Sequence, residues 1–359
     1  MSRLAKSEMT NGVDKFKERW RRAPAWFGNK FVPGGLILMY HRIVELPLDP
    51  FALAVTPQHF AEHLEVLRKY SHPISLSEMA RLLKDGQRPR RAVIVTFDDG
   101  YTDNLYNAKP LLERFDVPGT VFITTGQIGS EREFFWDELQ RLLLQHGTLP
   151  ETLKLQVNGS ALEWDLGAAS NYCEADYLSH AGWNIDESSD PSPRHTIFRS
   201  LHQLLKPLPR SEQQQSLEQL LAWSGTEATA RPTHRTMTAE EVRRLADGGL
   251  VTVGSHTVTH PVLSALKPDK QRAELEQSKA QLEEILDKPV RTFAYPFGGE
   301  SDYTAETVRL LREIGYDCAC SYFPGVIRAR TDRYQLPRIQ VKDWDGDELA
   351  RLLRWLALG

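Results

Sequence analysis

Short, continuous apolar runs alternate with helical segments along most of this chain, and this pattern constrains the fold more than any other feature. Such a run bounded by turn residues indicates a strand that is buried on both faces. Runs of this kind occupy residues 36–40, 92–97, 120–123, 250–254, 291–295 and 318–321. Helical segments follow at about 57–70, 77–84, 105–112, 269–286 and 305–314. The alternation predicts an α/β fold with a mostly parallel sheet and helices outside it.

The alternation stops between residues 126 and 236. This stretch contains a predicted helix at 136–145, a hairpin around 153–159 and helices at 196–205 and 211–223. We interpret 126–236 as an insertion that covers or flanks the functional site. Its aromatic residues either line a substrate groove or form a small core of the insertion: Phe134, Phe135, Trp136 and Trp164. The predicted plan is then a basic tail at 1–33, one α/β domain from 34–125 plus 237–359, and the insertion.

Composition excludes several classes of protein. The chain has 359 residues, enough for one large α/β domain with an insertion. Its net charge of -4 argues against a nucleic-acid partner, because such proteins are usually basic. Three cysteines argue against a disulfide framework. Cys318 and Cys320 would point the same way from a strand, as small core residues do.

The first thirty residues are basic and carry no apolar run of the kind found in a secretory signal. No stretch of the chain approaches the ~18 continuous apolar residues of a membrane span. The segment 16–22 mixes aromatic and basic residues, so residues 1–30 either contact an anionic membrane surface or form a solvated tail. We expect a cytoplasmic protein, with association at the inner face of the membrane as the alternative.

Two adjacent carboxylates, Asp98 and Asp99, directly follow the buried run 92–97 at a turn marked by Gly100. Successive side chains diverge, so one carboxylate can bind a metal while the other handles protons. An isolated Asp-Asp-Gly is more often a solvated turn.

His256 and His260 follow the run 250–254, at what should be the same edge of the sheet. Histidines four residues apart lie on one helical face or converge through a tight turn. Two imidazoles and a carboxylate such as Asp99 would leave open positions on a divalent ion for water and substrate.

The segment Tyr295-Pro296-Phe297 follows the run 291–295. It is either an ordinary strand-to-helix loop or a wall of the site that offers a backbone N–H to a developing oxyanion.

Together these motifs resemble the polysaccharide deacetylases, carbohydrate esterase family 4. Thr-Phe-Asp-Asp-Gly at 96–100 is similar to the first motif of that family, and His-Thr-x-x-His at 256–260 is similar to the second. The resemblance covers roughly 34–125 and 237–340. It implies a distorted (β/α) barrel of about seven strands, here with a large inserted segment.

The resemblance also implies roles for the site residues. Asp98 would be the general base, while Asp99, His256 and His260 would hold one divalent metal ion, with Zn²⁺ as the first choice. The N–H of Phe297 would help to stabilise the oxyanion, in a wall shared with Tyr295 and Pro296.

The chain departs from the family pattern at two places. Ala294 stands where the third motif normally has arginine, and no histidine follows His260 to act as the usual late general acid. His41, after the run 36–40, is the candidate acid, in a segment that resembles the circularly permuted poly-N-acetylglucosamine deacetylase branch. Arg338 either replaces the missing arginine beside Asp98 or is a surface or helix-capping residue.

The leading hypothesis is therefore a metal-dependent hydrolase that removes an N-acetyl group from an amino sugar in glycan, polysaccharide or glycolipid biosynthesis. Removal of a formyl group from a free, nucleotide-linked or lipid-linked N-formyl sugar is a close variant. A non-catalytic carbohydrate-binding scaffold and a structural partner of a membrane-bound glycan machine are the alternatives from other classes.

Overall fold

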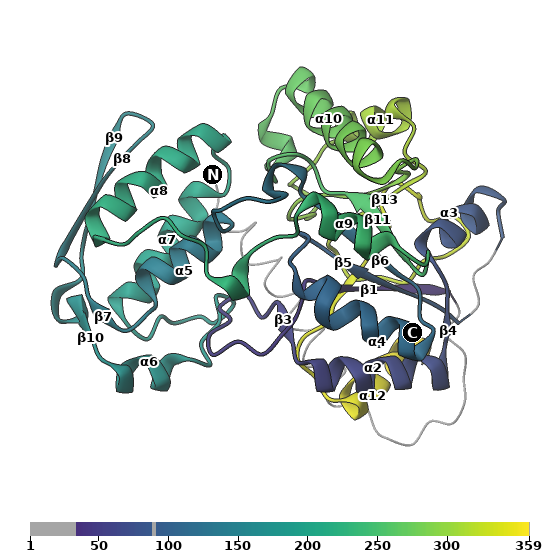
Figure 1. Ribbon diagram of the computed structural model, residues 1–359, viewed down its shortest axis with the longest axis horizontal. Coiled ribbons are helices and arrows are strands. Elements are labelled where there is room, and N and C mark those ends of the chain that lie inside the picture. Colours follow the sequence, from purple (N-terminus) through teal and green to yellow (C-terminus); the bar gives the residue numbers. More distant parts are fainter. Residues whose placement is uncertain (1–33, 88–90, 359) are drawn as a thin grey trace.

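The computed structural model describes residues 34–87 and 91–358. The predicted basic tail at 1–33 and its membrane contact lie outside the described residues. Figure 1 shows two lobes joined by several chain segments. One lobe is built around a sheet, and the other, in teal and green, carries the helices and the hairpin of the insertion.

The larger lobe is built on a parallel sheet with the strand order β13-β12-β11-β6-β5-β1-β14, and β4 pairs with β5 outside this path. Its strands are β1 (Gly35–Tyr40), β4 (His72–Pro73), β5 (Ala92–Phe97), β6 (Gly119–Ile123), β11 (Val251–Ser255), β12 (Thr292–Ala294), β13 (Cys318–Cys320) and β14 (Ile339–Gln340). A distorted barrel of about seven strands is confirmed.

Helices cover the outside of this sheet (Figure 1). They are α2 (Pro57–Tyr70), α3 (Leu76–Lys84), α4 (Lys109–Phe115), α9 (Ala239–Ala246), α10 (Pro268–Leu286), α11 (Ala305–Ile314) and α12 (Gly346–Leu358). Thr56 caps α2 and Thr238 forms a capping box with Glu241 at α9, as the sequence indicates. The helix predicted at 77–84 begins one residue earlier, at Leu76, with Ser75 as its cap.

One segment brings the two ends of the sheet together. Leu336 exchanges backbone hydrogen bonds with Ala319 and Ser321 beside β13, each at 2.9 Å. Three residues later, Ile339 pairs with Leu38 of β1. The segment from 336 to 340 therefore joins both edges, which curls the sheet into a distorted barrel.

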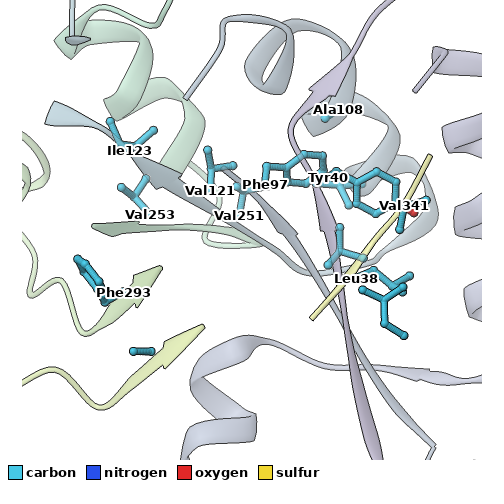
Figure 2. Close-up of a cluster of buried hydrophobic side chains, with 14 of the residues drawn as sticks. Leu38, Tyr40, Phe97, Ala108, Val121, Ile123, Val251, Val253, Phe293 and Val341 are labelled. Carbon is cyan, nitrogen blue, oxygen red and sulfur yellow. The ribbon is translucent and has the colours of Figure 1, made fainter. Parts of the chain in front are cut away.

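Alternating strand residues pack against the helices that cover the outside of the sheet. Figure 2 shows Leu38, Tyr40, Phe97, Val121 and Val251 in this cluster. All five side chains are buried. Cys318 and Cys320 are also buried, in a second cluster on the other face of the sheet. The continuous apolar runs of the sequence are explained by this burial on both faces.

The insertion has a hydrophobic core of its own. It contains α5 (Phe135–Leu143), α6 (Glu174–His180), α7 (Pro193–Leu205), α8 (Arg210–Ser224), the hairpin β8 (Thr152–Val157) and β9 (Ser160–Asp165), and the short pair β7 (Gly147–Thr148) and β10 (Asn171–Tyr172). Leu48 and Tyr101 of the barrel lobe belong to the same cluster. The insertion is thus packed within itself and also anchored on the barrel. In the described part of the chain, no helix is long and apolar enough to cross a bilayer.

Gly254 in β11 provides a test of barrel packing. A Cβ at this position would overlap the ring of Phe122 and come within 2.7 Å of Thr292 Oγ1. Gly254→Ala should lower the free energy of unfolding by about 1–3 kcal/mol, because a tightly packed core resists added volume. Gly182→Ala is the matched control, since the space that its added Cβ would take has no other part of the chain within 4 Å. Equal stability of the two variants in chemical denaturation would contradict this packing.

Candidate active site

The predicted site residues meet at the carboxyl ends of the barrel strands, which is where ligands bind in such folds. His41 follows β1, Asp98 and Asp99 follow β5, and His256 and His260 follow β11. These side chains line one cavity of about 220 Å³. The structure therefore brings together residues separated by more than 200 positions.

Asp99, His256 and His260 form a group that could hold a metal ion, with ligand atoms within 4.8 Å of one another. Asp99 Oδ1 lies 3.6 Å from His256 Nε2 and 3.4 Å from His260 Nε2. His256 Nδ1 lies 2.8 Å from the carbonyl oxygen of Ala294. If Nδ1 donates its proton there, Nε2 of His256 carries no proton and its lone pair faces Asp99. This is the tautomer that a metal-binding imidazole needs.

The electrostatics of this group also fit a cation. Burial raises the pKa of Asp99 well above its usual range, and the nearby carboxylates of Asp98 and Asp137 raise it further. Burial lowers the pKa of both His256 and His260, which favours the neutral imidazoles that bind metals. A divalent ion would compensate the buried Asp99 carboxylate directly. The donor set therefore fits a single divalent metal.

The loop that carries the two histidines is a turn and not a helix. Thr257 and His260 both have positive φ, at 66° and 57°. Glu274 of α10 accepts hydrogen bonds from the backbone N–H groups of Val258 and Thr259, at 2.8 and 2.9 Å. This carboxylate holds the turn in place, so the tight-turn alternative for the His-x-x-x-His spacing is correct.

Left-handed backbone recurs around the cavity. Asp99 and Phe297 have φ of 76° and 59°, in addition to the two residues of the histidine turn. Residues other than glycine rarely adopt these angles, and when they do they cluster at functional sites. At Asp99 this conformation turns its carboxylate away from that of Asp98, which explains how neighbours in sequence face different partners.

Asp98 faces Arg338 and not the histidine pair. Arg338 donates from both terminal nitrogens to the two carboxylate oxygens of Asp98, each at 2.7 Å, and its Nε donates to the carbonyl oxygen of Ser321 at 2.9 Å. Burial alone would raise the pKa of Asp98, but the charge of Arg338 and then that of His256 hold it at about 2. Of the two alternatives for Arg338, the structure shows the one beside Asp98.

His41 lies in the same cavity and is partly buried. Burial lowers its pKa to about 4, against the opposing effect of the Asp98 charge. Its Nδ1 is buried without a hydrogen-bond partner in the described part of the chain. An unsatisfied buried nitrogen is costly in a finished core, so it indicates a group available to a ligand.

Only one residue of the predicted wall Tyr295-Pro296-Phe297 lines the cavity. Phe297 lies there with its ring 4.7 Å from that of His260, and its N–H makes no hydrogen bond within the described residues. Tyr295 is different. Its ring stacks on Tyr303 and its hydroxyl donates to the carbonyl oxygen of Tyr334. The direct site role that we predicted for Tyr295 is wrong, because its side chain packs in the cluster between the sheet and the outer helices. Pro296 is buried in the turn and outside the cavity lining.

The insertion supplies a further wall. Trp136 lies 5.0 Å from the His260 ring, and its Nε1 donates to Tyr101 Oη, which in turn donates to Asp137 Oδ2 at 2.6 Å. Phe134 and Phe135 are buried in the core of the insertion. Both alternatives for these aromatics are therefore realised, by different residues.

His202, Tyr322 and Gln340 also line the cavity, and sequence analysis missed them because none belongs to a motif.

Comparisons with known proteins agree with this fold and site. A family model described as polysaccharide deacetylase matches residues 85–148 and 211–319. The poly-beta-1,6-N-acetyl-D-glucosamine N-deacetylase of Staphylococcus epidermidis is 31% identical over 108 residues, 26% of this chain and 37% of that protein. YxkH of Bacillus subtilis, named after the same family, is 30% identical over 128 residues, 34% of this chain and 44% of that protein. The matched segments thus span less than half of these relatives.

Solved structures show the same fold over almost the whole chain. IcaB from Ammonifex degensii aligns with a TM-score of 0.54 at 18% identity, covering 90% of this chain and 97% of that one. The Streptococcus pyogenes deacetylase PplD, solved in complex with acetate, aligns with a TM-score of 0.54 at 18% identity, covering 89% and 97%. The fold is that of the deacetylase barrels. The family model matches just under half of this chain, in two segments that carry both predicted motifs, 96–100 and 256–260.

The ion pair of Asp98 and Arg338 can be tested through stability. Arg338→Met should lower the free energy of unfolding by about 3–5 kcal/mol, because it leaves an uncompensated buried carboxylate. Adding Asp98→Asn should restore part of that loss. The exposed Arg328 provides the control variant Arg328→Met, with a change within about 0.5 kcal/mol. Denaturation curves in which the double variant is no more stable than Arg338→Met would argue against the pair.

Metal binding provides a separate test. The purified protein should bind one equivalent of a divalent ion such as Zn²⁺, measured by elemental analysis after dialysis. His260→Ala should lose most of this metal, because one of three protein ligands is missing. His59→Ala is the control, since His59 lies in α2 and bonds Asp343 outside the cavity. Full retention of the ion by His260→Ala would remove this group from the metal site.

Proposed function

We propose that this protein is a metal-dependent hydrolase that removes an N-acetyl group from an amino sugar in glycan, polysaccharide or glycolipid biosynthesis. The observation that carries the proposal is the buried cluster in which Asp98 adjoins the group of Asp99, His256 and His260. The match to the polysaccharide deacetylase model supports the reaction type, and the names of relatives such as the Staphylococcus epidermidis deacetylase support the class of substrate.

The metal in this proposal is Zn²⁺, held by Asp99, His256 and His260. Two imidazoles and one carboxylate are an established ligand set for catalytic zinc. When bound, the ion supplies a Lewis acid that polarises the amide carbonyl and makes water more acidic.

Asp98 acts as the general base that accepts the proton of the attacking water. Its bidentate pair with Arg338 keeps it ionised and fixed in orientation, and each carboxylate oxygen retains a lone pair for the proton. Arg338 is a positioning residue in this scheme, since it acts through Asp98.

His41 acts as the acid that protonates the leaving amine. Its low pKa means that the imidazole is neutral before reaction, so in this scheme it gains its proton during turnover, from Asp98 after the water has been deprotonated. The N–H of Phe297 is the proposed donor to the developing oxyanion. The aromatic rings of Trp136 and Phe297 exclude water from the reacting atoms.

The formyl variant of the proposal differs only in the acid that is released. A panel of N-acetyl and N-formyl amino sugars, free, nucleotide-linked and lipid-linked, should be incubated with metal-loaded protein, and acetate and formate measured. Release of acetate supports the proposal, and release of formate alone replaces it with the variant. A folded, metal-loaded protein that releases neither would favour the non-catalytic carbohydrate-binding scaffold.

Asp98→Asn should lose nearly all turnover while retaining the metal, because the amide cannot accept the proton but leaves the three ligands in place. Acetate release and metal content are measured on the same sample. Turnover equal to that of the unaltered protein would remove Asp98 from the role of base.

His41→Ala should lower kcat by a factor of about 10²–10⁴, the usual contribution of a general acid. His63→Ala is the control, because His63 is also buried but bonds Tyr40 and the carbonyl oxygen of Trp344 in the core. Acetate release at an undiminished rate in His41→Ala would assign the acid role to another group.

We propose further that the protein works in the cytoplasm, at or near the inner face of the membrane, through residues 1–30. Co-sedimentation of the full chain, and of a chain lacking these residues, with anionic lipid vesicles tests the contact. Equal sedimentation of the two would contradict it.

A further inference from the structure

The cavity over the proposed metal site is lined by side chains of both lobes. Its lining comes from the carboxyl ends of the barrel strands and from the insertion, and its volume of about 220 Å³ lies below the ~300–1,000 Å³ of pockets for drug-sized ligands. A volume of this size suits one sugar ring with its acyl group. The question is whether further sugar units could continue from that ring in both directions.

The barrel half of the rim is a chain of direct contacts. Gln340 Nε2 donates to the carbonyl oxygen of Ala52 at 3.2 Å, and Tyr322 Oη donates to Gln340 Oε1 at 2.7 Å. The N–H of Tyr322 then donates to the carbonyl oxygen of Gly298 at 2.6 Å, next to Phe297. These bonds link the connection between β2 (Arg42–Ile43) and β3 (Ala54–Val55), the end of β13 and the loop after β12.

The insertion completes the rim from both ends of this chain. At one end, Lys206 lies 4.3 Å from the ring centroid of Phe297 and 3.1 Å from Asp302. At the other end, His202 lies 4.8 Å from the ring of Phe51. Lys206 and His202 are one helical turn apart at the end of α7, so these contacts form a closed circuit of residues, which we call the collar. Five members of the collar line the cavity: Phe51, His202, Phe297, Tyr322 and Gln340.

Two more contacts fasten the insertion to the barrel beside the collar. The N–H of Ile185 donates to the carbonyl oxygen of Pro50 at 2.8 Å, and Asp186 pairs with Lys342 at 3.7 Å. Ile185 and Asp186 both line the cavity. The insertion therefore touches the barrel at Pro50 and Lys342 in addition to its collar contacts with Phe51 and Phe297. An open groove, in contrast, would leave two opposite sides free.

A polymer that presents an internal sugar must enter and leave the site on two sides. A closed collar leaves only the opening along its own axis, so a substrate can enter only end-on. We propose that this protein deacylates a terminal amino sugar, at a chain end or on a single-sugar carrier, and excludes internal sugars of a polymer. This inference rests on the proposed function and adds the position of the reacting sugar.

The test uses the full metal-loaded protein and N-acetylglucosamine oligomers of one to six units, with lipid-linked and nucleotide-linked single sugars as further arms. Mass spectrometry with fragmentation locates each deacetylated unit. The expected result is one acetate per chain, always from a terminal unit. The rate per chain end should change by less than about tenfold from dimer to hexamer, because added units would lie outside the collar.

Acetate from internal units of the oligomers would overturn this inference and leave the proposed function intact. No acetate or formate from any substrate would overturn both. These two failures are therefore distinguishable in one experiment.

A variant tests whether the collar is the cause. The double variant Lys206→Ala, Asp186→Ala removes two contacts between the insertion and the barrel, that of Lys206 with Phe297 and Asp302 and that of Asp186 with Lys342. Deacetylation of internal units should then appear. Glu163→Ala is the matched control, since it removes an exposed ion pair with Lys154 on the hairpin of the same insertion, and its products should remain terminal. If the folded double variant still deacetylates only terminal units, the collar is not what excludes internal units. If that variant fails to fold, the positional assay of the unaltered protein still decides the inference.

Discussion

The buried pair of Asp98 and Arg338 is the interaction on which the site depends. Arg338 lies in the segment that joins the two edges of the sheet, and Asp98 follows β5, an interior strand between β6 and β1. A carboxylate in such a dry position is costly unless a cation with good geometry compensates it. The same bond therefore keeps the proposed base ionised, fixes its direction and ties the closing segment to the middle of the barrel.

The chemistry around this pair is arranged mainly by the backbone. Positive φ at Asp99, in the histidine turn and at Phe297 directs side chains that a regular strand or helix would send elsewhere. Hydrogen bonds from the surrounding structure hold these conformations, and the Glu274 carboxylate under the histidine turn is the clearest case. Strain of this kind persists only where neighbouring contacts determine it, which is typical of functional sites.

The insertion and the barrel divide the work between them. The barrel supplies the metal ligands, the proposed base and the proposed acid, while the insertion supplies Trp136, Ile185, Asp186 and His202 to the cavity. Because the insertion has its own core, its surface toward the cavity can change without disturbing the strands. In the proposed function, the barrel thus carries the reacting groups while the insertion contributes to the wall around the substrate.

The sequence by itself determined the sheet, most helix boundaries and the identity of the motif residues, because burial on both faces and helix capping are local patterns. It also singled out Arg338 and His41, through what the family motifs lacked. Only the tertiary structure decided that Arg338 faces Asp98, that the histidines converge through a turn, and that Tyr295 packs in the core. It alone showed His202 and Lys206 of one helix closing the cavity against Phe51 and Phe297. Contacts between residues so far apart in the chain leave no periodic signal, since they arise from how the elements pack against one another.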